Sequence, residues 1–391
     1  MRLLHVIANL QREAGGPAQA CIEAARLMAR RGHQVRIITT DRGLPPDYRG
    51  GERPQSPAMP AIEAFPESFP RFWDASWAMR RRLATAIPEA DVVHLNSLYL
   101  FHDWAAGDCC RRFGTPYIVR PHGMLDPYIR ARHRWRKSVM EGLFQNAVLR
   151  RAAGVHYTTE EEWELARPNA HNARGWVVPI GVELGAFERL PPKHLLRARY
   201  PEIGERRIVL FFGRLNFKKG LDTAIAAFAR AARSREDVFL LLVGPDGGMR
   251  RQAEQWVQAA GIADRARFTG MVSGEEKRLV LAGSDIFVLP SLSENFGISV
   301  IEAAACGLPV IISDRVNLWR DFARAEAGLV APPAVEPFTA HLETLLDDPE
   351  GALAMGRRGA ALVRQNFTWD VLGERYEAMY REAAETRGRA A

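Results

Sequence analysis

The sequence predicts an α/β protein with two domains, each built around a parallel sheet. The chain has 391 residues, which is more than one typical domain holds. Short apolar runs alternate with helical segments, as in residues 3–8, 17–31 and 34–39, and this alternation indicates β-α-β units. The run 208–213 is apolar throughout up to its glycine, which is typical of a strand that is buried on both faces.

The expected strands are short apolar runs, each followed by polar residues or glycine that form a loop. In the first half of the chain they cover residues 3–8, 34–39, 91–95, 116–119, 154–159 and 175–179. In the second half they cover residues 208–213, 238–244, 266–270, 285–289 and 308–313. A helix over residues 17–31, closed by Gly32, joins the first two strands. Ligands of such sheets bind beyond the carboxyl ends of the strands, so the loops at those ends are the candidate sites.

Changes in composition set the expected domain limits. We expect a first domain over residues 1–180, a second domain over 207–368, and a final amphipathic helix in 369–391. The stretch 181–206 contains Pro191-Pro192 and a charged run, and we interpret it as a linker.

Residues 41–70 are rich in Pro and Gly and lack a periodic pattern, so we predict one long loop there. Loops of this length are often functional. Its expected apolar anchors are Phe65, Phe69, Phe72 and Trp73.

The composition is that of an ordinary globular protein. Apolar residues make up 47% of the chain, and no stretch approaches the length of a membrane helix. The four cysteines, Cys21, Cys109, Cys110 and Cys306, form neither a C-x-x-C pair nor a metal-like cluster, so we expect reduced thiols in a cytosolic protein. Residues 1–10 are interpreted as a first strand rather than a signal peptide.

The net charge of +7 belongs entirely to the first half of the chain. Residues 1–180 hold 25 Lys and Arg against 18 Asp and Glu, whereas residues 181–391 hold 28 of each. This asymmetry favours an acidic partner, either anionic lipid or a phosphorylated acceptor. A solvated basic surface without a partner is the alternative. Because no nucleic-acid-binding motif accompanies the charge, we expect no nucleic acid partner.

Residues 130–137, R-A-R-H-R-W-R-K, begin a basic amphipathic segment that extends to residue 151. We predict a helix that packs its apolar stripe on the sheet, while the arginines at 130–137 face an anionic membrane surface. A helix that lies on the membrane through the stripe itself is the alternative. The residues of the stripe, at helical spacing, are Trp135, Val139, Met140, Leu143, Phe144 and Val148.

The most informative stretch covers residues 289–310, where a strand ends, a polar loop follows and a helix begins. The N–H groups and the dipole at the start of such a helix favour an anion, and Gly297 allows the backbone to approach it closely. Two carboxylates, Glu294 and Glu302, bracket this point. Carboxylates beside an anion site suit an anion that carries hydroxyl groups, so the stretch predicts a nucleotide-sugar site. An ordinary strand-loop-helix unit with solvated glutamates is the alternative.

The same stretch resembles a known signature. E-N-F-G-I-S-V-I-E at 294–302, followed by A-C-G-L-P-V, is similar to the E-x7-E motif of retaining glycosyltransferases with two facing Rossmann-like domains, the GT-B architecture, and most of all to family 4 of that group. G-R-L-N-F-K-K-G at 213–220 resembles the family's G-R-L-x-x-x-K-G motif. Pro179–Glu183 departs from the family's P-N-G-V-D at two positions, Ile180 and Glu183.

The resemblance implies roles for particular residues. Arg214 and Lys219 would hold the diphosphate, Glu294 the sugar hydroxyls and Glu302 the ribose, and His122 would reach the donor or acceptor from the facing domain. It also implies a donor site in the interdomain cleft, an acceptor that is read in part by residues 41–70, and a final helix that crosses back to the first domain. The other substrate-binding residues that it implies are Gly15, Gly16, Gly213, Met271, Val272, Asn295, Phe296, Gly297 and Ile298.

The resulting expectation is a retaining hexosyltransferase that moves a sugar from a nucleoside diphosphate donor to a hydroxyl of a glycan or lipid-linked sugar, in bacterial polysaccharide or lipid-linked glycan assembly. We expect no cofactor and no metal, because Arg214, Lys219 and backbone amides serve the diphosphate and no D-x-D motif is present. We expect a cytoplasmic protein, peripheral on the inner face of the plasma membrane. The alternatives are a nucleotide-sugar epimerase or hydrolase on the same fold, and a catalytically silent partner subunit.

Overall fold

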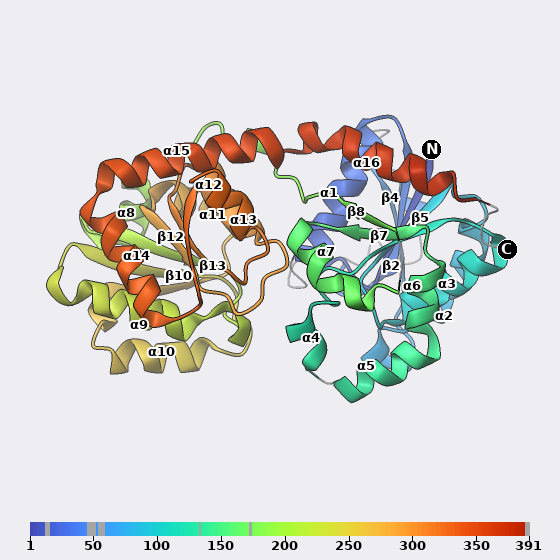
Figure 1. Ribbon diagram of the computed structural model, residues 1–391, viewed down its shortest axis with the longest axis horizontal. Coiled ribbons are helices and arrows are strands. Elements are labelled where there is room, and N and C mark those ends of the chain that lie inside the picture. The colour runs from blue at the N-terminus through green and yellow to red at the C-terminus, as the bar shows by residue number, and fades with distance from the viewer. Residues whose placement is uncertain (12–15, 45–51, 54–58, 133, 172–173, 388–391) are drawn as a thin grey trace. The chain divides into compact units, whose positions relative to one another are not determined.

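The computed structural model describes residues 1–11, 16–44, 52–53, 59–132, 134–171 and 174–387. The chain divides into two compact units (Figure 1). The first unit holds Met1–Gly181 and Trp369–Ala391, and the second holds Val182–Thr368. Each unit is a parallel sheet with helices on its faces, so the predicted α/β class with two Rossmann-like domains is confirmed.

The first unit contains an eight-stranded sheet in the order β3-β4-β2-β1-β5-β6-β7-β8. Its strands are parallel except for the antiparallel pair β3-β4. The order reverses between β1 and β5, which makes that position the switch point of the sheet. The strands are β1 Arg2–Ile7, β2 Gln34–Thr40, β3 Glu52–Arg53, β4 Ala61–Phe65, β5 Val92–Asn96, β6 Tyr117–Arg120, β7 Gly154–Tyr157 and β8 Gly175–Val177.

The helices of the first unit connect these strands, and the last helix of the chain joins them. The final helix, α16 Trp369–Ala384, packs beside α1 Gly16–Arg30. An ion pair links them, with Arg31 Nε 2.8 Å from Glu377 Oε1. The other helices are α2 Trp77–Ala86, α3 Phe101–Phe113, α4 Pro127–Ala131, α5 Arg134–Met140, α6 Asn146–Arg151 and α7 Glu160–Ala166.

A row of buried histidines crosses the first sheet beneath α16. His5 and His94 are register partners on β1 and β5, and His156 lies on β7. The Tyr380 hydroxyl of α16 lies 2.8 Å from His94 Nδ1 and 3.3 Å from His5 Nε2. Burial and the nearby Arg120 charge lower the pKa of His5 to about 3. Burial also lowers the pKa values of His94 and His156 well below the usual range, so all three rings are neutral at pH 7.

The second unit contains a six-stranded parallel sheet in the order β11-β10-β9-β12-β13-β14. This is the order of a doubly wound nucleotide-binding sheet, with its switch point between β9 and β12. Strands β10 and β12 are buried throughout, and β9 is buried except at its two end residues, as their apolar sequences predict. The strands are β9 Arg207–Phe212, β10 Val238–Val243, β11 Ala266–Gly270, β12 Ile286–Leu289, β13 Val310–Ser313 and β14 Gly328–Ala331.

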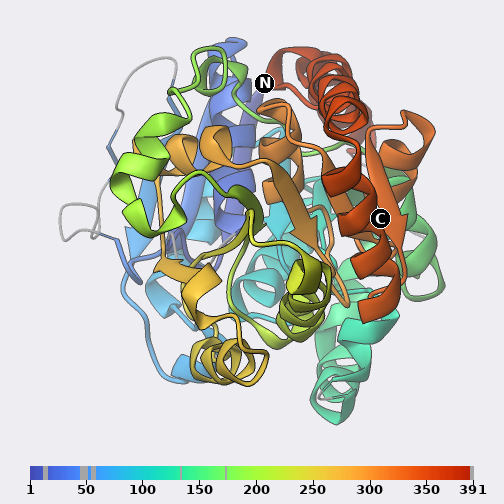
Figure 2. The ribbon, with the colours of Figure 1, turned by 90° about the vertical axis from the view of Figure 1, so that its left-hand side faces the viewer.

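The helices of the second unit cover both faces of this sheet. Figure 2, in which this unit faces the viewer, shows α14 and α15 together in red along one side. The helices are α8 His194–Arg199, α9 Leu221–Ala231, α10 Arg250–Ala259, α11 Gly274–Gly283, α12 Ile298–Ala305, α13 Trp319–Arg324, α14 Val335–Asp347 and α15 Pro349–Asn366.

The stretch 181–206, which the sequence predicts to be a linker, is for the most part a component of the second unit. Helix α8 packs on α11, and Leu196 of α8 is fully buried there. Lys193 Nζ also lies 2.7 Å from Asp285 Oδ1 at the start of β12. Apolar burial on α11 and this ion pair hold the segment to the second unit, so it is not a free connection.

Residues 41–70 are not one long loop. Strand β4 lies within them and pairs in parallel with β2, and β3 pairs with β4. Residues 45–51 and 54–58 lie outside the described part of the chain. Of the four expected anchors, Phe65 and Trp73 pack on the core, whereas Phe69 and Phe72 are exposed.

The predicted helix over 130–151 is divided into α4, α5, a π-helical turn Glu141–Gln145 and α6. Only part of its apolar stripe packs on the core, through Met140, Phe144 and Val148, and the segment meets helix α3 there rather than the sheet. Trp135, Val139 and Leu143 lie on another side of the same segment and are 68%, 54% and 76% exposed. The expectation that the whole stripe is buried is therefore wrong, because the apolar residues form two rows at i, i+4 spacing and only one row faces the core.

Candidate functional site

The switch point of the second sheet brings together two loops that the sequence singles out. The loop after β9 carries Arg214 and Lys219, and the loop after β12 carries Glu294. Both loops leave the carboxyl ends of neighbouring strands, because β9 pairs with β12. This is the position at which open α/β sheets bind ligands.

Close backbone approach holds the two loops together. Gly220 has φ +67°, and a Cβ atom there would lie 2.0 Å from the Pro290 carbonyl oxygen, so only glycine fits. The Leu292 N–H donates to the Lys218 carbonyl oxygen at 2.7 Å. The loop that carries the lysines is therefore fixed to the loop that carries Glu294.

The Lys219 ammonium donates a hydrogen bond to Glu294 Oε2. The two side chains are 13% and 15% exposed, so water screens this pair only weakly. Burial opposes the charge of Glu294, but Lys219 and Lys218 outweigh it and lower the pKa of this carboxyl. Glu294 is therefore an ionised hydrogen-bond acceptor at pH 7.

A third loop fixes the backbone of Glu294. The Glu294 N–H donates to the Arg315 carbonyl oxygen at 2.9 Å, and its own carbonyl accepts from the Asn317 N–H at 3.0 Å. Glu294 thus lies on a clamped backbone rather than on a freely moving loop. The backbone from which the carboxylate extends is therefore set before any ligand arrives, which favours binding.

Helix α12 begins directly after this loop. Gly297 precedes it with φ +78°, a conformation that glycine adopts without strain, and Ile298 is its first residue. The N–H groups of Ile298 and Ser299 lie at the positive end of the helix dipole, ahead of the first bonds that Val300 and Ile301 donate to the Gly297 carbonyl oxygen. Phe296 is a different case, because its ring is buried against Phe367 and only its backbone remains for a ligand.

Glu302, on α12, is held by a residue that sequence reasoning missed. Lys277 Nζ of α11 lies 2.6 Å from Glu302 Oε1, and the Glu302 side chain is 8% exposed. The two residues are 25 positions apart on different helices, so no spacing rule connects them. The single available signal was a lysine near the N-terminus of a helix, where the dipole disfavours a cation.

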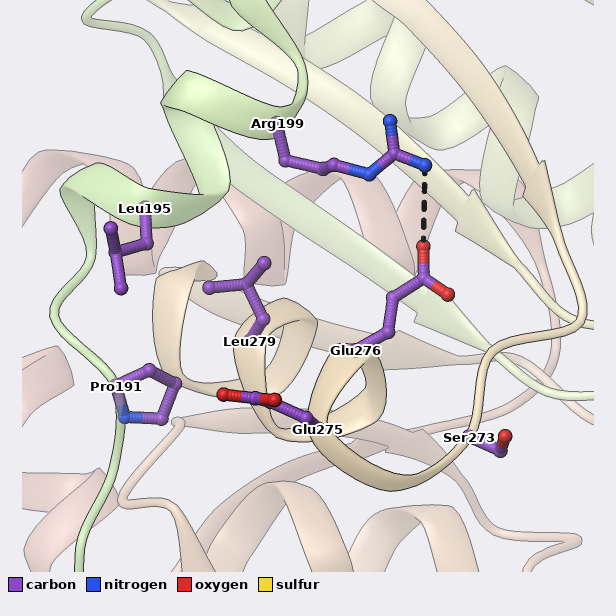
Figure 3. A pocket seen from close by; sticks show the side chains of 7 residues that line it. All are labelled: Pro191, Leu195, Arg199, Ser273, Glu275, Glu276 and Leu279. Carbon is purple, nitrogen blue, oxygen red and sulfur yellow. Dashed lines mark ion pairs between the residues drawn. The ribbon is translucent and has the colours of Figure 1, made fainter.

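The loop before α11 contains Met271, which is largely exposed, and Val272, which is buried. It continues into a shallow groove between α8 and α11 (Figure 3). This groove shares only Ser273 with the loop, and it is lined by none of Arg214, Lys219, Glu294 or Glu302. It is therefore distinct from the switch-point site. Its lining residues are Pro191, Leu195, Arg199, Ser273, Glu275, Glu276 and Leu279.

In the first unit, His122 follows the end of β6 and has a left-handed backbone, with φ +50°. Burial and the Arg120 charge lower the pKa of its imidazole well below the usual range. The ring is therefore neutral at pH 7 and has one donor and one acceptor nitrogen. Gly16 is the first residue of α1, after the switch-point strand β1, whereas Gly15 lies outside the described residues.

Two features are absent from the described part of the chain. No group of three or more His, Cys, Asp or Glu is arranged to hold a metal ion there. No helix in the described ranges is long and apolar enough to cross a membrane.

Two family models match this chain. Residues 193–361 match the model of glycosyl transferases group 1, and residues 15–181 match that of the glycosyl transferase 4-like domain. The division between the two models falls close to the boundary between the two structural units.

The curated relatives that the chain matches include glycosyltransferases. The chain is 35% identical over 211 residues to a D-inositol 3-phosphate glycosyltransferase of Segniliparus rotundus. The aligned region makes up 53% of this chain and 46% of the relative. It is 30% identical over 287 residues to a 2-deoxystreptamine glucosyltransferase of Streptomyces kanamyceticus, and this alignment covers 68% of this chain and 70% of the relative. The match to the first of these thus spans about half of the relative's length.

Among solved structures, Anabaena HepE in complex with UDP-glucose has a similar fold. The TM-score is 0.78 at 16% identity, and the match covers 97% of this chain and 99% of that one. At this identity the likeness shows the fold alone.

Proposed function

The chain belongs to family 4 of the glycosyltransferases, within glycosyl transferases group 1 and with the GT-B fold, and from this premise we propose that it transfers a hexosyl group with retention of anomeric configuration. The donor is a nucleoside diphosphate sugar, and the acceptor is a hydroxyl of a glycan or lipid-linked sugar. The observation that carries the proposal is the lysine-paired carboxylate Glu294 at the switch point of the second unit.

The leaving group of this reaction is a nucleoside diphosphate, on which negative charge develops as the glycosidic bond breaks. Lys219, Arg214 and the first N–H groups of α12 are the donors that stabilise this charge. A diphosphate at this point competes with Glu294 for the Lys219 ammonium. Its arrival therefore releases the carboxylate for other hydrogen bonds.

The released Glu294 accepts hydrogen bonds from the hydroxyls of the transferred sugar and stabilises positive charge at the anomeric carbon. Glu302, held by Lys277, accepts the hydroxyls of the ribose. His122 contacts the donor or the acceptor through its neutral imidazole. Since cationic side chains and amides serve the diphosphate, the reaction needs no divalent metal.

We place the acceptor at an anionic membrane surface that meets residues 130–137. The exposed row Trp135, Val139 and Leu143 supports this, because it lies in the same segment as Arg132, Arg134, Arg136 and Lys137. Apolar side chains beside cations suit the boundary between lipid headgroups and acyl chains. The enzyme then works as a peripheral protein on lipid-linked glycans at the cytoplasmic leaflet.

A donor screen tests the proposal. The purified chain is incubated with UDP-glucose, GDP-mannose and other nucleotide sugars, with and without a mixture of glycan and lipid-linked acceptors, and free nucleoside diphosphate is measured. We expect release that depends on an acceptor, and a product with the anomeric configuration of the donor. Release without any acceptor indicates a hydrolase, and an inverted product contradicts the retaining mechanism.

A further inference from the structure

The turn that carries His122 contains two successive residues with left-handed backbones, His122 at φ +50° and Gly123 at φ +78°. Glycine adopts this conformation without strain, but for histidine it is strained. Such a conformation persists only where the surrounding structure holds it. The contact that does so identifies a further residue of the site.

That contact comes from helix α7. Glu162 Oε1 accepts a hydrogen bond of 2.8 Å from the Gly123 N–H. Glu162 Oε2 accepts two more, of 2.7 Å each, from the N–H and the hydroxyl of Thr158. One carboxylate thus joins the loop after β6 to the end of the neighbouring strand β7. Glu162 is 3% exposed, so water does not replace these bonds.

Within the described ranges, no such hydrogen bond supports the ring of His122 itself. Its Nε2 atom is buried and has no hydrogen-bond partner among the described residues. The direction of the imidazole therefore follows from the backbone turn, and the turn follows from the bond between Gly123 and Glu162. We propose that Glu162 is a positioning residue that aims His122 at the substrates, an inference that rests on the proposed function of His122.

A role limited to the stability of α7 is the competing explanation. The helix, however, already has a cap, because Thr159 Oγ1 accepts the Glu162 N–H at 3.0 Å. Glu160 and Glu161 also place negative charge in its first turn. Stability of α7 thus does not require the Glu162 carboxylate, and Thr159→Ala is a matched control that weakens the same helix without touching Gly123.

The experiment compares Glu162→Gln, His122→Ala, the double variant and Thr159→Ala. Glutamine keeps the shape of Glu162, but it points an NH₂ group at one of the N–H donors and so breaks one end of the link. We expect Glu162→Gln to lower kcat by about tenfold to a hundredfold with little change in donor KM, the size of effect that small misplacements produce. In a chain that already carries His122→Ala, Glu162→Gln should lower kcat by no more than about twofold. The kcat of Thr159→Ala should stay within about twofold of wild type.

A second readout does not depend on turnover. The NMR signal of the His122 ring Cε1–H should shift in Glu162→Gln and stay in place in Thr159→Ala. If Glu162→Gln fails to fold, Glu162→Asp replaces it, since a chain shorter by one methylene cannot span both ends of the link.

The outcomes separate the two claims. Equal losses of kcat from Glu162→Gln in the presence and absence of His122, or wild-type kcat in Glu162→Gln, overturn the positioning role. Wild-type kcat in His122→Ala overturns the proposed role of His122 alone. In that case the ring signal decides, because an unmoved signal in Glu162→Gln refutes positioning and a moved signal supports it.

Discussion

Lys277 Nζ lies 2.6 Å from Glu302 Oε1, so a lysine of α11 holds the second glutamate of the E-x7-E pair. A carboxylate that is held at one oxygen has a fixed orientation, and its remaining lone pairs are directed at one place. If Glu302 binds ribose hydroxyls, Lys277 determines how well it does so.

We predict that Lys277→Met weakens binding of the nucleoside diphosphate by about tenfold, the order of one hydrogen bond to a charged group. The loss should disappear for the 2′-deoxy nucleotide, which lacks one of the hydroxyls. Calorimetric titration with both nucleotides measures it, and Arg278→Met on the same helix is the control. Equal weakening of both nucleotides contradicts a role through the ribose.

The pairing of Lys219 with Glu294 predicts that loss of either side chain strongly lowers the rate of turnover. Lys219→Met and Glu294→Gln should each lower the single-turnover rate by about 10²–10³, the usual cost of one preorganised charge-stabilising group. A single variant that stays within a few-fold of wild type would remove its residue from the proposed mechanism.

Stability of the same variants provides a separate check. Lys219→Met leaves the weakly exposed Glu294 without its nearest cation, so it should lower the free energy of unfolding by about 1–3 kcal/mol, less than for a fully buried pair. The double variant should be more stable than Lys219→Met, because no uncompensated carboxylate remains. Urea unfolding measures both, and a double variant that loses the sum of the single losses is the contrary result.

Activity should persist in excess chelator. Arg214, Lys219 and the N–H groups of α12 are assigned to the diphosphate, so no step of the proposed mechanism calls for a divalent ion. The test compares initial rates with and without EDTA, before and after addition of Mg²⁺ or Mn²⁺. Complete loss in EDTA that either ion restores would refute metal independence.

Binding to lipid vesicles should rise with the fraction of anionic lipid and fall with salt, since each basic residue near such a surface contributes about 1 kcal/mol. Replacing Arg130, Arg132, Arg134, Arg136 and Lys137 by Gln should remove the dependence on lipid charge. Replacing Trp135, Val139 and Leu143 by Ser should weaken binding to every vesicle. The control, Arg111→Gln with Arg112→Gln on α3, should change neither, and equal binding to neutral and anionic vesicles would refute the proposed surface.

The buried histidines predict a loss of stability in mild acid. The folded-state pKa of His5 is about 3, whereas an unfolded histidine titrates near 6.5. Between these values the unfolded chain binds more protons, so the free energy of unfolding rises with pH. The stabilisation that comes from the neutral, buried His5 is complete above about pH 6.5 and is lost as the pH falls from there toward 3. Urea unfolding at pH 7 and pH 5 should show the drop, and His94→Gln should make it smaller.

Much of the fold could be predicted because its strands are local patterns. The run 208–213 predicted β9, and Gly32 with φ +85° ends the segment of α1 where the sequence placed the stop. Strand β4 was missed for a physical reason. Its central Glu63 is 4% exposed and interrupts the apolar run, and its partners Arg36 and Arg82 come from distant positions.

The candidate site shows the same limit. Arg214, Lys219 and Glu294 could be identified because each follows a recognisable strand in a known motif. Lys277 and Glu162 could not, because each acts through a single contact made by the folded chain, with Glu302 and with the Gly123 amide. Hydrogen bonds across 25 or 39 positions leave no trace in local spacing.

The second unit occupies one uninterrupted stretch of sequence, residues 182–368, and the first unit lies on both sides of it. Where the chain passes from one unit to the other, each unit makes a contact of its own between the incoming and outgoing segments. The Val182 N–H donates to the Phe367 carbonyl oxygen at 2.8 Å, and in the first unit Gly181 lies against the Trp369 ring. In genetic terms, one continuous coding segment specifies the whole second unit. Two recombination points, at codons 181/182 and 368/369, exchange it whole and cut through no helix or strand. The same exchange leaves α16 with the half of the protein to which it is bonded.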